Sequence, residues 1–366
     1  MGFKCGIVGL PNVGKSTLFN ALTQTATAEA ANYPFCTIDP NTGMVPVPDT
    51  RLEACAEIAQ SAQVIPTQLT FVDIAGLVRG ASKGEGLGNQ FLSHIREVDA
   101  IIQVLRCFED TDITHVDGKV DPLADLETIE TELMLADLES LEKRSAAMVK
   151  RTRGNDDEAK QTLALVERAI EKLQDGEPAR NVEVSEDEQP AFQRLQLLTT
   201  KPLLYVCNVD EGSAAEGNEL SAKVQAKAAE EGVPCIIISA AIESEIAMLE
   251  TREEQQEFLG EIGLEETGLS RIIRAGYDLL GLITYFTAGP NEARAWTIHD
   301  GTKAPQAAGV IHTDFEKGFI RAETIAYDDY VELGGEAGAK AAGRTRLEGK
   351  DYVVNDGDVM LFRFNT

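Results

Sequence analysis

A glycine-rich loop near the start of the 366-residue chain has residue types that suit phosphate binding. Residues 9–16, GLPNVGKS, fit the pattern G-x-x-x-x-G-K-[ST] at every position. A strand-like apolar run, Phe3 to Val8, precedes the loop, and a helix-like run, Lys15 to Thr23, follows it. In that setting the backbone N–H groups of the loop and the helix N-terminus point at phosphate oxygens. The pattern predicts a nucleoside-triphosphate site.

Particular loop residues have distinct expected roles. Lys15 is expected to neutralise the β- and γ-phosphates, a catalytic role, and the Ser16 hydroxyl to bind Mg²⁺. Asn12 is also a candidate ligand for a monovalent cation such as K⁺, with ordinary loop packing as the alternative. The nucleotide-contacting residues predicted here are Asn12, Val13, Gly14, Lys15, Ser16 and Thr17.

A second element, VDIAG at residues 72–76, follows the strand-like run Leu69 to Asp73. Asp73 is expected to hold Mg²⁺ through water, and Gly76 to offer its N–H to a γ-phosphate as a catalytic contact. D-x-x-G alone is usually a turn, but after a phosphate loop it indicates the second switch of a GTPase-type fold. The glycine-rich stretch that follows, as far as Asn89, suits a segment that orders around the γ-phosphate.

The first switch is expected between the phosphate-loop helix and the next strand. Thr37 is the candidate there, as a third Mg²⁺ ligand, and Thr42 is the alternative. The choice depends on position in the chain alone.

The base-binding segment follows the strand-like run Leu203 to Cys207 and reads NVDE at 208–211. Guanine-specific domains normally have N-K-x-D there, whose Asp accepts two hydrogen bonds from guanine. Val209 replaces the Lys and Glu211 replaces the Asp, so the guanine contact is lost while adenine loses nothing. The segment favours ATP over GTP; the alternative is that Asp210 or a shifted Glu211 still reads guanine. The predicted base contacts are Asn208, Val209, Glu211, Ser239 and Ala240, the last two through backbone N–H groups.

The residue that orients the attacking water is not evident. Many GTPases have a Gln directly after the switch glycine, but this chain has Leu77, which cannot orient water. His115 is the one internal candidate for a catalytic role, although a lone loop histidine is more often incidental.

The surrounding pattern predicts the elements that must position these residues. Short apolar strands alternate with helices in residues 1–125 and again in 197–280, which indicates one α/β nucleotide-binding domain closed by a helix at Leu269 to Leu280. Residues 126–196 carry heptad-like apolar spacing on both sides of a polar turn and predict an inserted antiparallel helical coiled coil, with two ordinary surface helices as the alternative. Residues 281–366 predict a small α+β domain.

Composition excludes several classes of protein. The net charge of −28 and pI near 4.5 argue against a uniformly basic nucleic-acid coat or an anionic-membrane binder. No apolar run of about 18 residues and no signal-peptide pattern is present. Six scattered cysteines without a C-x-x-C pair predict reduced thiols in a cytoplasmic protein.

These motifs together resemble the YchF group of Obg-like ATPases. The resemblance rests on residues 9–16, 32–41, 73–89, 208–211 and 309–319, and it covers essentially the whole chain. It implies a P-loop G domain, the inserted coiled coil and a C-terminal TGS domain with a β-grasp, ubiquitin-like fold.

The resemblance also implies Mg²⁺-dependent hydrolysis of ATP in preference to GTP, and association with the large ribosomal subunit or the whole ribosome. Leu77 and Glu211 match family traits, whereas Val209 stands where Met is more usual. Two functions follow: an ATP-hydrolysing switch, with a GTPase of the Obg type as the runner-up among enzymes, or a nucleotide-gated ribosome-binding module whose hydrolysis is incidental.

Basic residues gather locally despite the acidic total. One run lies near the expected tip of the coiled coil and the other in the last domain, where Glu348 is the local acid. Such runs usually form a solvated helix surface. Because both runs lie on projecting domains, we expect them to make salt-sensitive contacts with ribosomal RNA. The runs are Lys143, Arg144, Lys150, Arg151 and Arg153, and Lys340, Arg344, Arg346 and Lys350.

Overall fold

The first of two β-sheets carries the phosphate loop. The structure is a computed structural model that describes residues 3–30, 41–75, 87–110, 115, 118–152, 157–249 and 251–365. The sheet has the strand order β2-β4-β1-β5-β6-β7, with β2 antiparallel to β4 and all other neighbours parallel. Its strands are β1 (Lys4–Val8), β2 (Thr42–Pro46), β4 (Gln68–Asp73), β5 (Ala100–Arg106), β6 (Leu203–Asn208) and β7 (Cys235–Ile238). The α/β prediction is confirmed.

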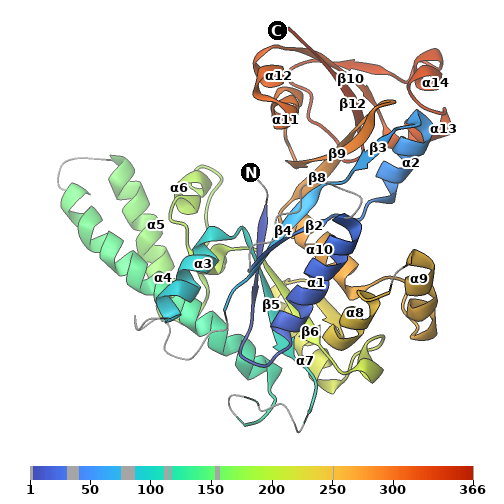
Figure 1. The fold of residues 1–366 in the computed structure, drawn as a ribbon. Coiled ribbons are helices and arrows are strands. Elements are labelled where there is room, and N and C mark those ends of the chain that lie inside the picture. The colour runs from blue at the N-terminus through green and yellow to red at the C-terminus, as the bar shows by residue number, and fades with distance from the viewer. Residues whose placement is uncertain are drawn as a thin grey trace.

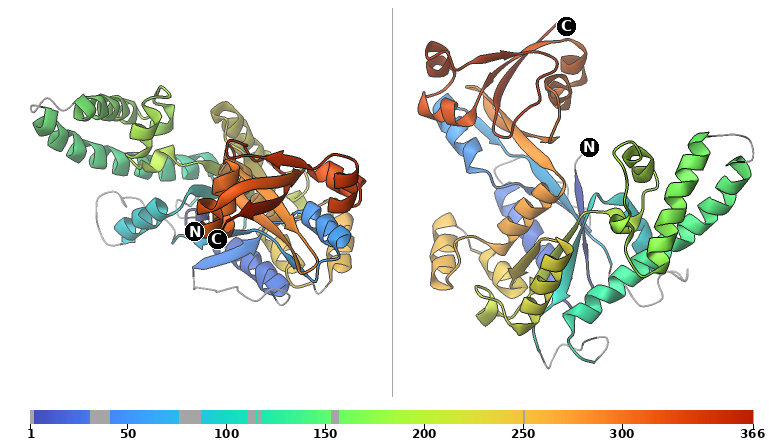
Figure 2. Two further views of the ribbon diagram at one scale, coloured as in Figure 1. Left: turned by 90° about the horizontal axis from the view of Figure 1, so that it is seen from above. Right: turned by 180° about the vertical axis from the view of Figure 1, so that it is seen from behind.

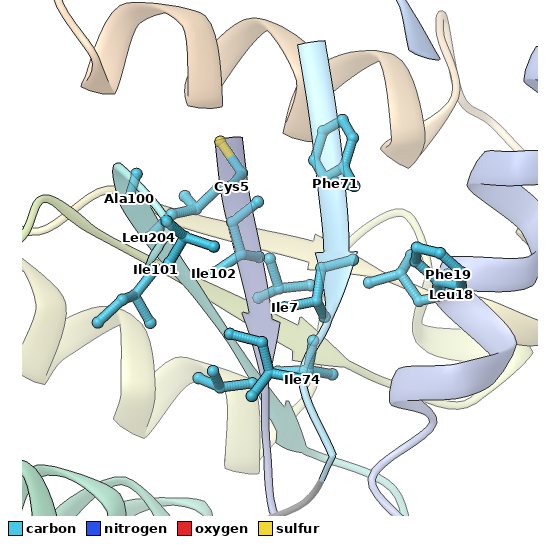
Figure 3. Packing of buried hydrophobic residues seen from close by; sticks show 14 of the residues in the cluster. Cys5, Ile7, Leu18, Phe19, Phe71, Ile74, Ala100, Ile101, Ile102 and Leu204 are labelled. Atoms are coloured by element: carbon cyan, nitrogen blue, oxygen red, sulfur yellow. The ribbon is translucent and has the colours of Figure 1, made fainter. Parts of the chain in front are cut away.

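Helices cover both faces of this sheet (Figures 1 and 3). Helices α1 (Lys15–Ala30) and α10 (Gly268–Leu279) pack on one face, and α3 (Leu87–Glu97), α4 (Pro122–Thr152) and α7 (Glu219–Glu231) on the other. Leu18 and Phe19 of α1 join the buried cluster that contains Ile7 of β1 and Phe71 of β4. Because the parallel strands end at one edge of the sheet, the loops that follow them meet there.

The predicted inserted hairpin is present. Helix α4 and helix α5 (Asp157–Gln174) pack side by side and project from the sheet (Figures 1 and 2). Leu141 and Val166 are buried between them, as the heptad pattern predicts. The buried carboxylate of Asp137 ties the hairpin to the turn that precedes β6, since it accepts hydrogen bonds from the backbone N–H groups of Leu198 and Thr199, both at 2.8 Å. Short elements that pack nearby are η2 (Ala179–Asn181), α6 (Gln189–Gln193) and η3 (Leu198–Thr200).

The second sheet forms the C-terminal domain and has the order β11-β10-β12-β8-β9-β3. Strands β8 and β9 form an antiparallel hairpin, and β12 lies parallel to β8 between that hairpin and β10. Helix α11 follows β9 and packs on the sheet, which gives the predicted β-grasp arrangement. The elements are β8 (Leu282–Ala288), β9 (Glu292–His299), α11 (Ala304–Ile311), α12 (Thr313–Lys317), β10 (Phe319–Ile325), α13 (Tyr327–Glu332), α14 (Glu336–Ala341), β11 (Arg346–Glu348) and β12 (Val359–Phe364).

One segment from the first 125 residues packs on the C-terminal sheet. After β2 the chain enters α2 (Thr50–Ala59) and β3 (Gln63–Ile65), and β3 pairs in parallel with β9. Leu52 of α2 is buried with Phe286 of β8, and in Figures 1 and 2 the blue α2 lies beside the orange and red elements. From sequence, residues 1–125 were all expected in the nucleotide domain. In the structure the apolar face of α2 and the strand β3 belong with the C-terminal sheet, whose other strands lie more than two hundred residues later in the chain.

The described residues contain no helix that is long and apolar enough to cross a membrane. The five described cysteines are free thiols, and Cys36 lies outside the described residues. Burial raises the pKa of the Cys5 and Cys55 thiols to about 12, so both stay protonated at neutral pH. The other helical elements are η4 (Glu211–Ser213), α8 (Ala240–Ile246) and α9 (Arg252–Glu261).

Candidate nucleotide-binding site

The phosphate loop joins β1 to α1 at the carboxyl edge of the first sheet. Asn12 and Gly14 both adopt left-handed backbone conformations, with φ of 63° and 90°. Helix α1 begins directly after them at Lys15 and exposes Ser16 and Thr17 in its first turn. The loop therefore aims the positive end of the helix dipole at the space above the sheet, where phosphates are expected.

The side chains of Lys15 and Asp73 form an ion pair, so the phosphate loop and the end of β4 meet. Both side chains are largely buried, with 10% and 17% of their surface exposed. The pair brings a cationic ligand for phosphate next to a carboxylate, and the exposed Ser16 hydroxyl adds a second oxygen donor in the same turn. Hydroxyl and carboxylate oxygens are the donors that Mg²⁺ prefers, so this donor set fits the predicted metal. Thr37 and Gly76 lie outside the described residues, and the alternative Thr42 is paired with Val72 at the start of β2.

Asn208 connects the phosphate loop to the base-binding loop. Its side chain is buried, with 4% of the residue exposed at the end of β6. The Nδ2 atom donates to the carbonyl of Val13 at 2.9 Å, and Oδ1 accepts from the backbone N–H of Ala240 at 2.9 Å. One amide thus fixes two loops through opposite ends of its dipole, which no apolar residue of similar size can do. The sequence predicted Asn208 as a base contact, whereas its hydrogen bonds in this structure hold the walls of the site.

A cavity of about 710 Å³ opens beside these loops. Most of the predicted nucleotide-binding residues line it, which brings together segments almost two hundred residues apart in the chain. The lining residues are Asn12, Gly14, Thr17, Phe108, Glu109, Asp110, Asn208, Val209, Asp210, Glu211, Gly212, Ser239, Ala240 and Ala241.

The carboxylates of the NVDE segment differ in what they contact. Asp210 accepts hydrogen bonds from the Ser213 hydroxyl at 3.0 Å, and its second partner is the Asn218 amide at 3.5 Å. Glu211 is exposed at the cavity and makes no side-chain hydrogen bond to any residue that the structure describes. Val209 is buried and donates its backbone N–H to Ile238 at 2.8 Å. Glu211 is therefore the carboxylate available to a bound base, while Asp210 braces the loop before α7.

The loop after β7 supplies Ser239 and Ala240. The Ala240 N–H, predicted to contact the base, donates to Asn208 in this structure. The Ser239 hydroxyl oxygen is buried at the cavity and has no hydrogen-bond partner within the described ranges. A buried, unpartnered hydroxyl usually calls for a ligand or water, so Ser239 is the better candidate of the two for contact with a base.

His115 lies away from the lining of the cavity. The residue is buried, with 6% exposed, and its Nε2 lies 3.0 Å from a carboxylate oxygen of Asp125 in the first turn of α4. That carboxylate fixes the ring orientation. Its predicted role in orienting water stays a prediction, and the contact with Asp125 fits the alternative, a histidine that holds a loop to a helix.

Sequence reasoning missed one wall of the cavity, the segment Phe108 to Asp110 after β5. It has no motif spacing. The segment could have been found from its position, because it directly follows a buried strand of the same sheet that neighbours β6 and the base-binding loop.

The basic run in the C-terminal domain is partly paired with acidic residues that lie outside the run. Arg346 contacts Asp358 at 3.1 Å as well as Glu348 at 3.7 Å, and Arg344 lies 3.7 Å from Asp329. The expectation that Glu348 is its one nearby acid is therefore wrong. In the hairpin run, Arg144 donates to the carbonyl of Leu195 at 2.7 Å, and Arg153 lies outside the described residues.

The sheet order, the phosphate loop and the paired Lys15 and Asp73 define a P-loop nucleotide-binding protein with a GTPase-type domain. Comparison with known proteins agrees: the family model described as "50S ribosome-binding GTPase" matches residues 4–136, and the YchF-GTPase_C model, described as "Protein of unknown function (DUF933)", matches 282–365. Curated relatives named "Ribosome-binding ATPase YchF" are 60% identical in Haemophilus influenzae and 57% identical in Bacillus subtilis, each over all of both chains.

A solved structure described as the Schizosaccharomyces pombe YchF GTPase is 42% identical. It superposes with a TM-score of 0.90 over 99% of this chain and 98% of that one. The chain therefore belongs to the YchF family.

Proposed function

We propose that this protein is an ATP-hydrolysing P-loop switch that uses Mg²⁺ and acts on the ribosome in translation or its regulation. ATP binding is supported most directly by the cavity that the phosphate loop and the NVDE segment line together, with Asp73 held at the phosphate loop by its ion pair with Lys15. Relatives of the same length that are named ribosome-binding ATPases support both parts of the proposal. A protein that acts on the ribosome is expected in the cytoplasm.

The metal site is proposed at Ser16 and Asp73, with Thr37 as the third protein ligand predicted from sequence. Mg²⁺ held there would supply positive charge to the β- and γ-phosphate oxygens. Lys15 would reach the same phosphates from the loop, and its contact with Asp73 places the two side chains side by side. Asn12 keeps the role predicted for it, a ligand for a bridging K⁺.

Selectivity for adenine is proposed to come from Val209 and Glu211. Glu211 is one methylene longer than the Asp of guanine-specific sites, and the aliphatic Val209 cannot supply the amine of the usual Lys. Phe108, on the wall that follows β5, offers an aromatic ring on which either purine can stack, so it adds affinity without choosing the base. The relatives' names are divided between ATPase and GTPase, which makes base selectivity the property to measure.

Restoring the guanine motif is expected to reverse the preference for ATP. We expect the double variant Val209→Lys with Glu211→Asp to shift the ATP-to-GTP affinity ratio toward GTP by about 100-fold, because two buried hydrogen bonds to guanine become available. The measurement is competition of ATP and GTP for a fluorescent nucleotide. Asp210→Asn is the matched control, since that carboxylate contacts Ser213 and Asn218. A changed ratio in the control, with none in the double variant, would assign base reading to Asp210 instead.

The ribosome is proposed to contact the tip of the α4–α5 hairpin and the β-grasp domain through RNA. Charge reversal at Arg151 and Arg153 is expected to weaken binding to purified ribosomes by about tenfold and to reduce its salt dependence, because lost phosphate contacts release fewer counterions. Sedimentation with ribosomes at several salt concentrations measures both effects. Lys172→Glu, at the other end of α5 and paired with Glu177, is the control. Unchanged binding by the tip variant would place the contact elsewhere.

A further inference from the structure

Arg106, the last residue of β5, is a buried arginine beside the nucleotide cavity. Only 1% of its surface is exposed, and it is the largest of the fully buried side chains among the described residues. Its Nε donates to the carbonyl of Phe108 at 3.2 Å, and its Nη2 donates to the carbonyl of Asp110 at 3.3 Å. The guanidinium carbon also lies 4.6 Å from the centre of the Phe108 ring. One side chain therefore holds both the backbone and the ring of the segment that follows it.

That segment is the wall of the cavity that has no sequence motif. Phe108 and Asp110 both line the cavity, and Arg106 itself does not. Burying a guanidinium costs more than burying an aliphatic residue, so its presence needs a geometric reason. Only arginine has a planar fork that can donate to two carbonyls and lie against an aromatic ring at once.

The anchoring continues into β6. Arg106 and Asn208 are partners in the register of β5 and β6, at the same level of the sheet. The next backbone N–H, that of Cys107, donates to the carbonyl of Asn208 at 2.8 Å. Asn208 extends to the phosphate loop and the base loop, and Arg106 to the third wall, so adjacent strand ends fix all three walls.

We propose that Arg106 is a positioning residue for the nucleotide base: it fixes the Phe108 ring and the Phe108–Asp110 backbone in the orientation against which the purine stacks. The inference rests on the proposed ATP-binding function and adds a residue that acts through Phe108. It predicts a defect confined to ligands that contain a base, because the phosphate loop and Lys15 lie on other elements.

The test compares ATP with inorganic tripolyphosphate, which has phosphates but no base. In Arg106→Gln we expect KM for ATP to rise about tenfold, the loss typical of hydrogen bonds from a charged group, while kcat stays within about twofold. The inhibition constant of tripolyphosphate is expected to be unchanged. Arg168→Gln is the matched control, because that arginine also donates to a backbone carbonyl, that of Glu183, but lies on the hairpin; its KM is expected to equal that of wild type.

A second variant tests the route through Phe108 and covers the case in which Arg106→Gln does not fold. Arg106→Lys keeps the charge without the fork, and it is measured alone and combined with Phe108→Ala. If Arg106 acts through the ring, the combined variant has the KM of Phe108→Ala alone. Fully additive losses, or a parallel loss of tripolyphosphate binding, would overturn the inference.

Wild-type protein that neither binds nor hydrolyses ATP would overturn the proposed function itself. Equal ATP binding by wild type and by both Arg106 variants would overturn only this inference.

Discussion

Alanine at Lys15 is expected to lower ATP turnover by about 1,000-fold while leaving the fold intact. Lys15 is the one cation that the described residues place at the junction of the phosphate loop and β4, where it contacts Asp73. Charge that develops on the γ-phosphate oxygens in the transition state is stabilised by such a preorganised cation, and removing one typically costs about 10²–10³ in kcat. The measurement is phosphate release with Mg²⁺ and saturating ATP.

Lys227→Ala is the matched control for that experiment. Lys227 forms an ion pair with Glu231 on α7 and is itself partly exposed, and Glu231 keeps a second partner in the Tyr205 hydroxyl, so the loss of Lys227 removes the same charge at little cost to stability. Equal turnover in wild type and Lys15→Ala would show that the measured hydrolysis does not come from this site. Repeating both assays with purified ribosomes also tests the alternative of a binding module with incidental hydrolysis, because that alternative predicts no stimulation of the wild type.

The phosphate loop was predictable because its chemistry is local in sequence. Strand, loop and helix lie within about thirty residues, and the left-handed Gly14 and the helix start at Lys15 follow from the motif. The strands at Ala100 to Arg106 and Leu203 to Asn208 were equally recognisable, because central parallel strands are continuous apolar runs. Residues at the ends of those strands converge because parallel strands end at one edge of the sheet.

Features that depend on distant partners were not predictable. The segment α2–β3 is assigned by its packing on β8 and β9, and nothing local to residues 50–65 indicates that partner. The Ala240 N–H was expected to face the base. Its bond to Asn208 could not be predicted, because it joins residues 32 positions apart. Phe108 became a candidate only because it lines the cavity, and the contacts of Arg106 show how its loop is held.

Gly14→Ala is expected to abolish ATP binding at micromolar nucleotide, a loss of about 100-fold or more. Gly14 has φ of 90°, which an L-residue adopts at a cost of about 1–2 kcal/mol. An added Cβ would also collide with the Nδ2 atom of Asn208. Since Nδ2 donates to Val13 and the other end of the amide accepts from Ala240, moving Asn208 breaks the link between the two loops that shape the cavity.

Gly176→Ala separates the two causes. Gly176 has a similar φ of 79°, but a Cβ there would meet nothing within 4 Å. Both variants carry the backbone strain, and only Gly14→Ala carries the collision, so Gly176→Ala should lose about 1 kcal/mol of unfolding free energy and keep wild-type ATP affinity. Gly14→Ala should lose about 2 kcal/mol more, from the two hydrogen bonds of Asn208. Isothermal titration with ATP and chemical denaturation measure the two quantities. ATP affinity retained in Gly14→Ala would show that the loop accommodates a methyl group, and that the position of Asn208 does not control the nucleotide site.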